Sequence, residues 1–514
     1  MSKTIIIIGA GLAGLSAALQ AAENGCNVKL VSSLPSERAQ SVMAEGGINA
    51  ALNTKDENDS PEEHFTDTIK AACGLADPNA VWGMTQAAPE LVHWLLKLGV
   101  KFNMSGYDDV DLRNFGGQKK KRTAFAQSDT GKQIMTAMID AVRRKEASGM
   151  VERFSHHSFL TLRLCGNICC GCVIRDEYSQ ETVELPGDAV IAATGGMHGL
   201  FGNTTGSLSN TGEVTAELFR LGVPLANGEM IQYHPTTVKC GGKRMLISEA
   251  ARGEGGRLFA MKDGKQWYFM EEKYPELGNL MPRDITAREI WKVSHESEVF
   301  LDMTEISEEI ISNKLSGLAD DCMTYLHKDI RKEPVSVLPG IHYFMGGILV
   351  DEQHRTPIQN LYAAGECCAQ YHGANRLGGN SLLGALYGGR VAAKSACEQA
   401  DVVDLSCATQ IDFPPASQIS EIKQLNKVMQ ETMGVVRNEN TLLNGIQTVQ
   451  ALTGNLPLLG MAVLKSALAR KESRGAHWRE DYPKSNDDDY LKTTVARFDG
   501  KQIQISFVPV PERR

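Results

Sequence analysis

The stretch Ile5-Ile6-Ile7-Ile8-Gly9-Ala10-Gly11-Leu12-Ala13-Gly14 decides how the N-terminal part of the chain folds. Four isoleucines predict a buried strand, and the Ala- and Leu-rich segment after the glycines predicts a helix. Between the two, Gly9 permits a tight turn, Gly11 lets a pyrophosphate approach the backbone, and Gly14 lets the helix pack closely on the strand. Because a second strand is predicted at Val28 to Val31, the pattern indicates a β-α-β nucleotide-binding unit with its helix N-terminus toward the phosphates.

Length and composition limit the class of protein. The 514 residues suffice for several domains, and 42% hydrophobic with 22% charged residues suits a globular core. A formal charge of −9 argues against a broad nucleic-acid-binding surface. No apolar run approaches the roughly 18 residues that cross a membrane, and the apolar start is too short for a signal peptide. We therefore expect a cytoplasmic protein without direct membrane insertion.

Further features favour FAD over a shorter nucleotide. The strand Val190 to Ala193 ends in the small residues Thr194-Gly195, and Glu366 follows another strand, where its carboxylate could bind a polyol chain. The loop Gly46-Gly47 could reach an isoalloxazine ring. FAD is long and needs contacts at both ends, which these features supply. The second strand ends at Ser32 instead of the usual acidic residue, so the ribose hydroxyls would be held more weakly.

The order of elements predicts an α/β protein with an interrupted nucleotide-binding domain. We expect a Rossmann-like FAD-binding domain formed by residues 1–215 and 341–405. An α+β capping domain is expected at 216–340, inserted between these parts, and a C-terminal helical domain at 406–514. The last residues have the pattern of short strands.

Two groups of residues suggest sites, but simpler interpretations fit them better. The group Cys165, Cys169, Cys170 and Cys172 lacks the paired C-x-x-C spacing of zinc sites, so we expect reduced structural cysteines and no metal. The run Lys119 to Arg122 is expected to be a solvated face or turn.

Seven longer motifs, in this order along the chain, resemble the flavoprotein subunit of the succinate dehydrogenase/fumarate reductase family, to which L-aspartate oxidase is related. The resemblance extends from the first strand to about the last thirty residues. The motifs are Ala44-Glu45-Gly46-Gly47, Tyr233-His234-Pro235-Thr236, Ser248-Glu249-Ala250-Ala251-Arg252-Gly253-Glu254-Gly255-Gly256, Pro282-Arg283-Asp284, His342-Tyr343-Phe344-Met345-Gly346-Gly347, His372-Gly373-Ala374-Asn375-Arg376-Leu377-Gly378-Gly379-Asn380-Ser381-Leu382 and Arg470-Lys471-Glu472-Ser473-Arg474-Gly475-Ala476-His477.

The resemblance implies FAD and a small dicarboxylate bound side by side. Desolvating a carboxylate is costly unless cations and hydrogen-bond donors replace its water, and a planar guanidinium can bind it with two bonds. The expected substrate-binding residues are His234, Ser248, His342, Arg376, Phe115 and Gly47. The expected cofactor-binding residues are Gly9, Gly11, Gly14, Ser32, Gly46, Ala193, Thr194, Gly195, Glu366, Ser381 and Leu382.

The resemblance also implies the catalytic residues Arg283, Glu249 and Arg252. In the family, reduced flavin N5 gives a hydride to one carbon of fumarate, and an arginine, here Arg283, gives a proton to its neighbour. Arginine is normally always protonated, so it donates only to a developing negative centre and must regain its proton quickly. Glu249 and Arg252 would return the proton to Arg283. Simpler interpretations remain open: buried core histidines, a helix cap at Ser248 and a surface ion pair at Arg283-Asp284.

The chain departs from respiratory members of the family at Gln40. Those members carry a histidine in an Arg-Ser-His-Thr segment that is covalently attached to the flavin, whereas this chain has Arg38-Ala39-Gln40-Ser41. We therefore expect non-covalent FAD. Loss of the covalent bond is expected to lower the flavin potential, which favours fumarate reductase over succinate dehydrogenase activity.

Two alternatives are L-aspartate oxidase and a non-catalytic electron-transfer subunit. Aspartate oxidases also lack the histidine, but they carry a glutamate two residues after an arginine that can contact the substrate ammonium. Here Phe115 follows Arg113-Asn114 and offers an apolar wall instead. A non-catalytic subunit would not need the full proton-transfer set.

The chain lacks a cluster-ligating cysteine pattern, so its electrons must come from elsewhere. The resemblance implies an iron–sulfur subunit and membrane-bound quinone partners, which would hold the protein peripherally at the inner face of the membrane. The segment around Arg474 and His477 could contact such a subunit or serve internal packing. No nucleic-acid partner is expected.

Overall fold

A five-stranded parallel sheet, built from segments that are far apart in the sequence, forms the N-terminal part of the molecule. The computed structural model describes residues 2–106, 109–401, 411, 413 and 418–514. The strand order is β20-β10-β1-β2-β6, and every neighbouring pair is parallel. The strands are β1 (Thr4–Ile8), β2 (Asn27–Ser32), β6 (Val151–Ser155), β10 (Ala189–Ala192) and β20 (Leu361–Ala363).

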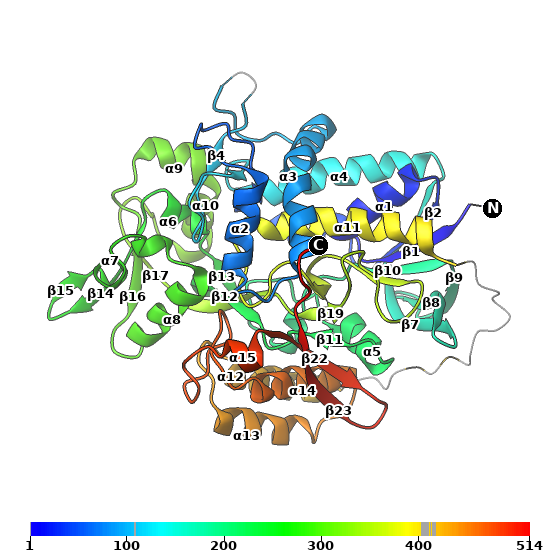
Figure 1. The fold of residues 1–514 in the computed structure, drawn as a ribbon. Coiled ribbons are helices and arrows are strands. Elements are labelled where there is room, and N and C mark those ends of the chain that lie inside the picture. The colour runs from blue at the N-terminus through cyan, green and yellow to red at the C-terminus, as the bar shows by residue number, and fades with distance from the viewer. Residues whose placement is uncertain (1, 107–108, 402–410, 412, 414–417) are drawn as a thin grey trace.

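The isoleucines of β1 are all buried because both faces of this sheet are covered. Ile5 and Ile7 pack against α1 (Leu12–Glu23), α4 (Thr130–Ala147) and α11 (Asn380–Gln399). Ile6 and Ile8 pack on the other side, against a three-stranded antiparallel sheet (Figure 1). That sheet consists of β7 (His157–Cys165), β8 (Ile168–Asp176) and β9 (Thr182–Pro186). The alternation of strand side chains thus explains a continuous apolar run.

Two helices follow the first β-α-β unit. The first begins after Ser60, whose hydroxyl accepts a hydrogen bond from the Glu63 backbone N–H at 3.2 Å and caps the helix. These helices are α2 (Pro61–Ala71) and α3 (Pro78–Leu98), which pack against each other.

The segment from Ile247 to Val337, which we call the inserted region, has a hydrophobic core of its own, to which, among the described residues, Phe115 is the one buried residue added from elsewhere. Its sheet has the order β15-β14-β16-β17, and short helices surround it at the left of Figure 1. The strands are β14 (Arg257–Lys262), β15 (Lys265–Trp267), β16 (Val299–Asp302) and β17 (Val335–Ser336), and the helices are α6 (Glu249–Gly253), α7 (Phe269–Lys273), α8 (Arg283–Val293), α9 (Glu308–Lys314) and α10 (Ser316–Asp321). A second sheet, β13-β12-β18, consists of β12 (Ile231–Cys240), β13 (Lys243–Leu246) and β18 (Leu338–Phe344).

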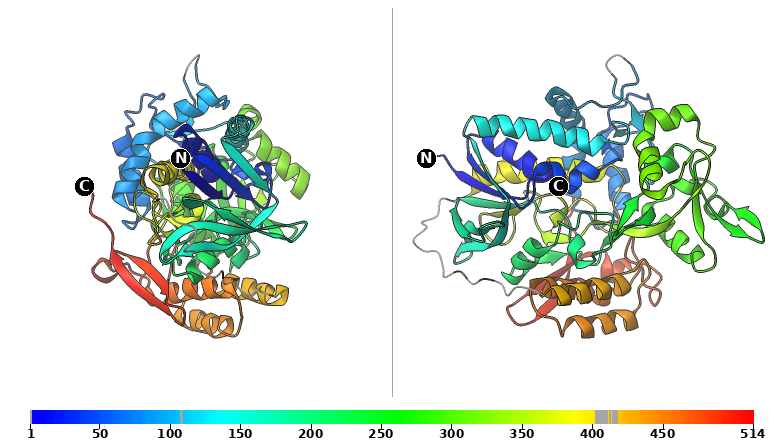
Figure 2. Two further views of the ribbon diagram at one scale, coloured as in Figure 1. Left: turned by 90° about the vertical axis from the view of Figure 1, so that its right-hand side faces the viewer. Right: turned by 180° about the vertical axis from the view of Figure 1, so that it is seen from behind.

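In its described residues, the C-terminal part combines four helices with a β-hairpin. The helices are α12 (Ile419–Thr432), α13 (Glu439–Val449), α14 (Asn455–Ala469) and the short α15 (Asp487–Tyr490). The hairpin, β22 (Lys492–Phe498) and β23 (Ile503–Pro509), extends the sheet β21-β19-β11-β22-β23 through β11 (Leu225–Ala226), β19 (Gly347–Leu349) and β21 (Cys368–Ala369). Figure 2 shows this part on the side of the molecule opposite α4. The predicted fold class is confirmed.

Two expectations from the sequence are wrong. Arg122 is not in a solvated turn: its guanidinium is fully buried and lies 2.8 Å from Asp59 and 2.9 Å from Asp67. Cys165 is disulfide-bonded, not reduced. Within the described part of the chain, the helices are all too short or too polar to cross a lipid bilayer.

Candidate active site

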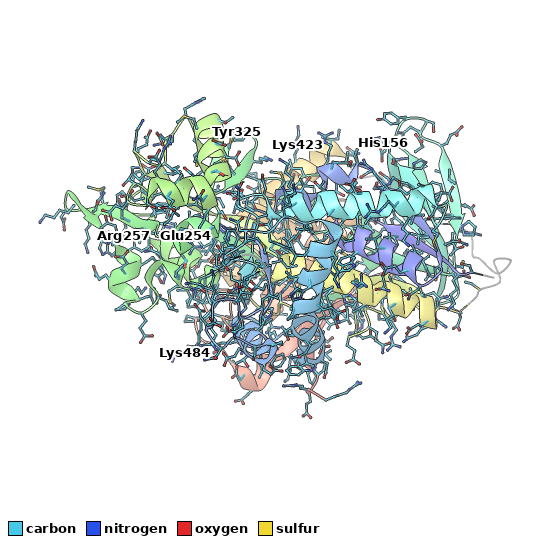
Figure 3. All side chains as sticks on the ribbon, turned by 90° about the horizontal axis from the view of Figure 1, so that it is seen from above. His156, Glu254, Arg257, Tyr325, Lys423 and Lys484 are labelled. Atoms are coloured by element: carbon cyan, nitrogen blue, oxygen red, sulfur yellow. The ribbon has the colours of Figure 1, made fainter. Side chains whose placement is uncertain are left out.

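A cavity of about 540 Å³ extends from the C-terminal ends of β1, β2 and β10 to the inserted region. All predicted site residues line it except Gly14 and Arg252, which lie behind its wall. Tyr325 also lines the cavity and is 58% exposed at the outer side of the inserted region, so the cavity opens to solvent there (Figure 3). The position matches the rule that ligands of open α/β sheets bind at the carboxyl ends of the strands.

The turn between β1 and α1 has room for backbone only. A Cβ atom on Gly9 would lie 2.2 Å from the Ala193 carbonyl oxygen, and a Cβ on Gly14 would lie 1.8 Å from that of Gly9. At Gly11, which lines the cavity, a Cβ would meet only the Ser41 hydroxyl at 3.6 Å and the Ala39 methyl at 3.8 Å. Gly9 and Gly14 are therefore needed by the fold, whereas Gly11 leaves space that a phosphate can use.

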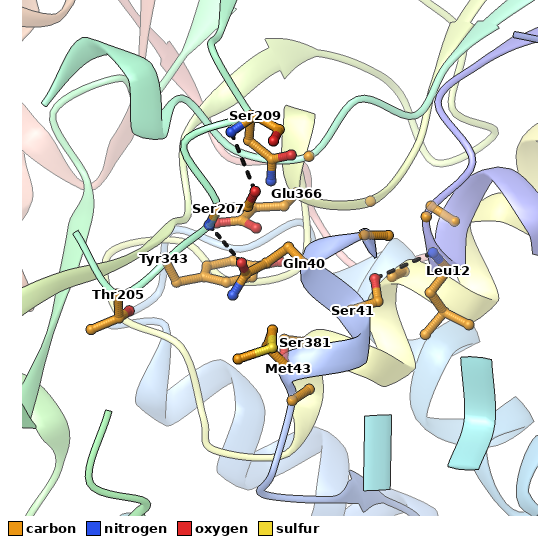
Figure 4. A pocket seen from close by; sticks show the side chains of 18 of the residues that line it. Leu12, Gln40, Ser41, Met43, Thr205, Ser207, Ser209, Tyr343, Glu366 and Ser381 are labelled. Carbon is orange, nitrogen blue, oxygen red and sulfur yellow. Dashed lines mark hydrogen bonds between the residues drawn. The ribbon is translucent and has the colours of Figure 1, made fainter. Parts of the chain in front are cut away.

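Residues 36–47 extend along the cavity, and we call this segment the strap. Two hydrogen bonds hold it in place. The Ser41 hydroxyl accepts a hydrogen bond from the Leu12 N–H at 3.2 Å, at the start of α1. The Gln40 carboxamide oxygen accepts one from the Ser207 backbone N–H at 2.6 Å, across the cavity from α1 (Figure 4). The sequence did not predict roles for Ser41 and Ser207. Ser41 acts through a single hydroxyl and Ser207 through its backbone N–H, and neither group belongs to a recognisable motif.

Ser32 and Glu366 provide polar groups suited to the sugar parts of a cofactor. The Ser32 hydroxyl is buried and has no hydrogen-bond partner among the described residues. Glu366 accepts a hydrogen bond from the Phe344 N–H at 3.1 Å, and burial raises the pKa of its carboxyl to about 7. An orphaned hydroxyl, a half-protonated carboxyl and the glycine turn together fit FAD.

His234 on β12 and His342 on β18 face each other at the inner end of the cavity, with ring centroids 5.1 Å apart. His342 Nδ1 lies 2.8 Å from the Thr205 hydroxyl, and His234 Nδ1 lies 3.1 Å from the Thr236 carbonyl oxygen. The hydrogen bonds of both rings to described residues all use Nδ1. Burial, and then the charge of Arg283, lower the pKa of both histidines well below the usual value, so both rings are neutral near pH 7, each with one N–H donor and one acceptor nitrogen.

Arg376 carries positive charge into the same end of the cavity. Its guanidinium carbon lies 4.1 Å over the ring of Tyr343, and its buried Nε has no partner among the described residues. Burial, followed by repulsion from Arg283, lowers the pKa of Arg376 to about 9. An anion bound beside Arg376 would stabilise the charged form of its buried guanidinium.

Glu249 binds Arg283 and Arg252 in one buried network. Arg283 donates to Glu249 Oε2 from Nε at 2.9 Å and from Nη2 at 2.6 Å, and Arg252 Nη2 donates to Oε1 at 3.2 Å. Burial alone would raise the pKa of Glu249, but the two guanidinium groups outweigh it and hold the pKa below the usual value. Glu249 is thus ionised and connects Arg283, which lines the cavity, to Arg252 behind it.

Phe115 forms an apolar part of the wall. A Cβ on Gly46 would lie 2.9 Å from its ring, and a Cβ on Gly378 would also lie 2.9 Å from it. Phe115 belongs to the core of the inserted region and is 2% exposed. It therefore offers the cavity no charged or hydrogen-bonding group.

Two family models match the chain. The model described as FAD binding domain matches residues 4–382, and the model described as fumarate reductase flavoprotein C-term matches residues 452–513. The chain belongs to the succinate dehydrogenase/fumarate reductase flavoprotein family. It is therefore an FAD-dependent oxidoreductase, and its family resemblance is confirmed.

Relatives in this flavoprotein family match over nearly their whole length. The succinate dehydrogenase flavoprotein subunit of Bacillus subtilis is 38% identical, with 100% of this chain and 98% of the relative covered. The 8-methylmenaquinol:fumarate reductase flavoprotein subunit of Wolinella succinogenes is 32% identical, with 100% and 92% covered. Among solved structures, Escherichia coli quinol fumarate reductase has a TM-score of 0.90 at 27% identity, with 99% and 97% of the chains covered.

In this flavoprotein, Glu45 is a further unusual residue, to which we assigned no role from the sequence. Burial, followed by repulsion from Asp321, raises the pKa of Glu45 to about 8. Its Oε2 is buried without a partner among the described residues, and Arg113 holds its backbone carbonyl at 3.0 Å. The sequence could not predict the raised pKa of Glu45, because it depends on the folded position of Asp321, which is far from Glu45 in the sequence.

Proposed function

We propose that this flavoprotein interconverts fumarate and succinate and acts mainly as a fumarate reductase. The observation that carries the proposal is the Arg283–Glu249–Arg252 network, which reaches the cavity wall beside two neutral histidines and Arg376. We also propose that residues 1–215 and 341–405 form the FAD-binding domain, residues 216–340 the capping domain and residues 406–514 the C-terminal helical domain.

The charge at the inner end of the cavity suits a dianionic substrate. Arg376 would bind one carboxylate, with His342 beside it. His234 and Ser248 would bind the other, helped by the backbone at Gly46 and Gly47. Ser248 also caps α6, where its hydroxyl accepts from the Ala250 N–H at 3.4 Å, so the helix-cap interpretation holds alongside a binding role.

Arg283 is the proposed proton donor. Bound FAD supplies the hydride in this reaction. Negative charge then develops on the neighbouring carbon of fumarate, and a cation beside it stabilises that charge and can give up a proton. Glu249 bonds to both arginines, so it can pass a proton from Arg252 to Arg283 without a rearrangement of the backbone.

Gln40 supports non-covalent FAD and the reducing direction. A carboxamide has no ring nitrogen that could attack a flavin methyl group, and the Gln40 oxygen is already engaged by Ser207. Without the covalent bond we expect a lower flavin potential, which disfavours succinate oxidation.

L-aspartate oxidase is the second candidate. It also lacks the covalent histidine, and this keeps it open. Phe115 argues against it, because a buried phenyl ring gives a substrate ammonium no countercharge. A purely electron-transferring subunit is the third candidate, and the intact proton-transfer network argues against it.

Electrons are proposed to come from an iron–sulfur subunit and, through it, from membrane-bound quinone partners, with the protein on the inner face of the membrane. The similarity to quinol fumarate reductases of known structure supports this proposal. Arg474 and His477, which we considered as a partner contact, are buried, so any such contact would be made by other residues of the helical part.

The proposed function is tested by anaerobic photoreduction of the flavin, followed by separate additions of fumarate, L-aspartate and an iminoaspartate analogue. Rapid reoxidation by fumarate alone supports the proposal. Reoxidation by the iminoaspartate analogue, with oxidised enzyme reduced by L-aspartate, would instead assign aspartate oxidase activity. No reoxidation by any of them would favour the electron-transfer subunit.

A further inference from the structure

Arg244, at the start of β13, is a cation without a countercharge in the wall of the cavity. Its Nε donates to the Thr237 hydroxyl at 2.6 Å and its Nη2 to the Leu338 carbonyl oxygen at 3.3 Å. Both acceptors are neutral, and among the described residues Arg244 forms no ion pair and its Nη1 has no partner. The guanidinium is thus oriented by two bonds but not neutralised.

The strand register places Arg244 next to the proposed dicarboxylate site. Gly340 on β18 is the direct antiparallel partner of His234 on β12. Side chains of directly opposed residues project from the same face of a sheet. A Cβ on Gly340 would lie 2.6 Å from Arg244 Nε, so the guanidinium occupies the space of that missing side chain, beside His234.

The cavity continues outward from Arg244 toward solvent. Lys243, the preceding residue, also lines the cavity and is exposed. A row of groups therefore extends from Arg376 and His342 inside, past His234, to Arg244 and then Lys243 at the rim. Burial lowers the pKa of Arg244, which reflects the cost of an unpaired cation that a carboxylate would reduce.

We propose that Arg244 forms an outer carboxylate site, which receives one carboxylate of an incoming dicarboxylate before the substrate moves inward to His234, His342 and Arg376. Guanidinium groups bind carboxylates with paired hydrogen bonds, and a cationic rim raises the local concentration of an anion and its association rate. The inference rests on the proposed function, since it takes its ligand class from that site. Arg244 is a positioning residue here, because it acts before the chemistry.

The test is the association rate of malonate, an inert dicarboxylate, with the oxidised FAD-loaded protein, followed by stopped-flow flavin absorbance. We expect Arg244→Met to lower the association rate constant about fivefold to tenfold at low ionic strength, and the difference to fade near 0.5 M salt because exposed charges are then screened. Arg244→Lys should keep most of the wild-type rate. In steady-state fumarate reduction, kcat/KM should fall in Arg244→Met while kcat stays the same.

The matched control is Lys265→Met, which removes the same charge from the exposed strand β15 outside the cavity and should change nothing. A wild-type association rate in Arg244→Met would overturn the proposal, and so would an equal, salt-independent loss in Arg244→Met and Arg244→Lys. Failure of wild-type protein to reduce fumarate would overturn the proposed function alone, because malonate association still tests Arg244. Absence of malonate binding to wild-type protein would overturn both.

Discussion

We propose that Gln40 leaves the flavin without a covalent bond, because a glutamine stands where respiratory members of the family carry the attached histidine. In the structure its carboxamide oxygen bonds to the Ser207 N–H and closes the strap over the cavity. Tight binding without a covalent bond is the expected state.

Acid precipitation of the FAD-loaded protein should therefore release all of the flavin into the supernatant. The bonds that hold FAD depend on the fold, and precipitation destroys them. The measurement is the flavin absorbance of supernatant and pellet after centrifugation. Yellow colour that stays in the washed pellet would contradict the interpretation of Gln40.

At this scale the sequence predicts which residues meet, but not their ionisation. Arg283 and Glu249 belong to motifs that are recognisable without coordinates, and their ion pair at 2.6 Å agrees with the proton relay that we infer. The raised pKa of Glu45 and the unpaired charge of Arg244 depend on what packs against them from remote segments. No local pattern encodes such surroundings.

The turn between β1 and α1 separates two roles of glycine within one element. Gly14 is needed because its missing side chain lets α1 approach β1, whereas the packing around Gly11 leaves room for a Cβ, and we propose that this glycine serves only the ligand. The motif alone assigns both roles, and the structure supplies the distances behind them.

Gly14→Ala should impair folding, because its methyl group would overlap the Gly9 carbonyl, and the soluble yield should fall with the flavin content. Gly11→Ala should keep the fold and thermal stability of the FAD-free protein but lose FAD affinity by at least about tenfold, since its methyl group fills only space beside the strap. Fluorescence titration with FAD and circular dichroism measure the two effects. Equal stability losses in both variants would refute this division of roles.

Elements with strong periodicity follow from the sequence, and short ones do not. The strand β1 and the helix α1 lie where the isoleucine run and the Ala- and Leu-rich segment predict them, because a buried apolar run and a 3.6-residue period act locally. The strand β11 has only two residues, and the C-terminal hairpin pairs with it across more than 260 residues of sequence. Burial of Arg122 has the same cause, since its partners Asp59 and Asp67 are distant in sequence.

Across the whole molecule, burial keeps many histidines neutral. Of 12 histidines, 7 have a pKa held below the ordinary value, mainly by burial, with values of about 3 for His64 and about 4 for His198 and His354. The other four are His234, His342, His372 and His477. In the unfolded chain these side chains titrate near pH 6.5.

The free energy of unfolding should therefore fall as the pH drops below about 6.5, because the unfolded chain then binds more protons than the folded one. Each extra proton contributes roughly 1.4 kcal/mol per pH unit. Six carboxyl groups act in the opposite direction, since their raised pKa values make the folded state bind protons, but the seven histidines outnumber them. These carboxyl groups belong to Glu45, Asp59, Glu213, Asp284, Asp321 and Glu366. Urea unfolding at pH 7.5, 6.5 and 5.5 measures the slope. A stability that is constant or rises toward pH 5.5 would be inconsistent with neutral buried histidines.

The most direct test of the central claim, that Arg283 protonates a dicarboxylate held in the cavity, is the rate at which fumarate reoxidises the photoreduced protein in a single anaerobic turnover, compared between wild type and Arg283→Ala. The account predicts fast reoxidation in wild type and a rate at least about a hundredfold lower in Arg283→Ala, with unchanged FAD content and malonate binding. Near-normal reoxidation in the variant, with FAD and malonate still bound, would contradict it.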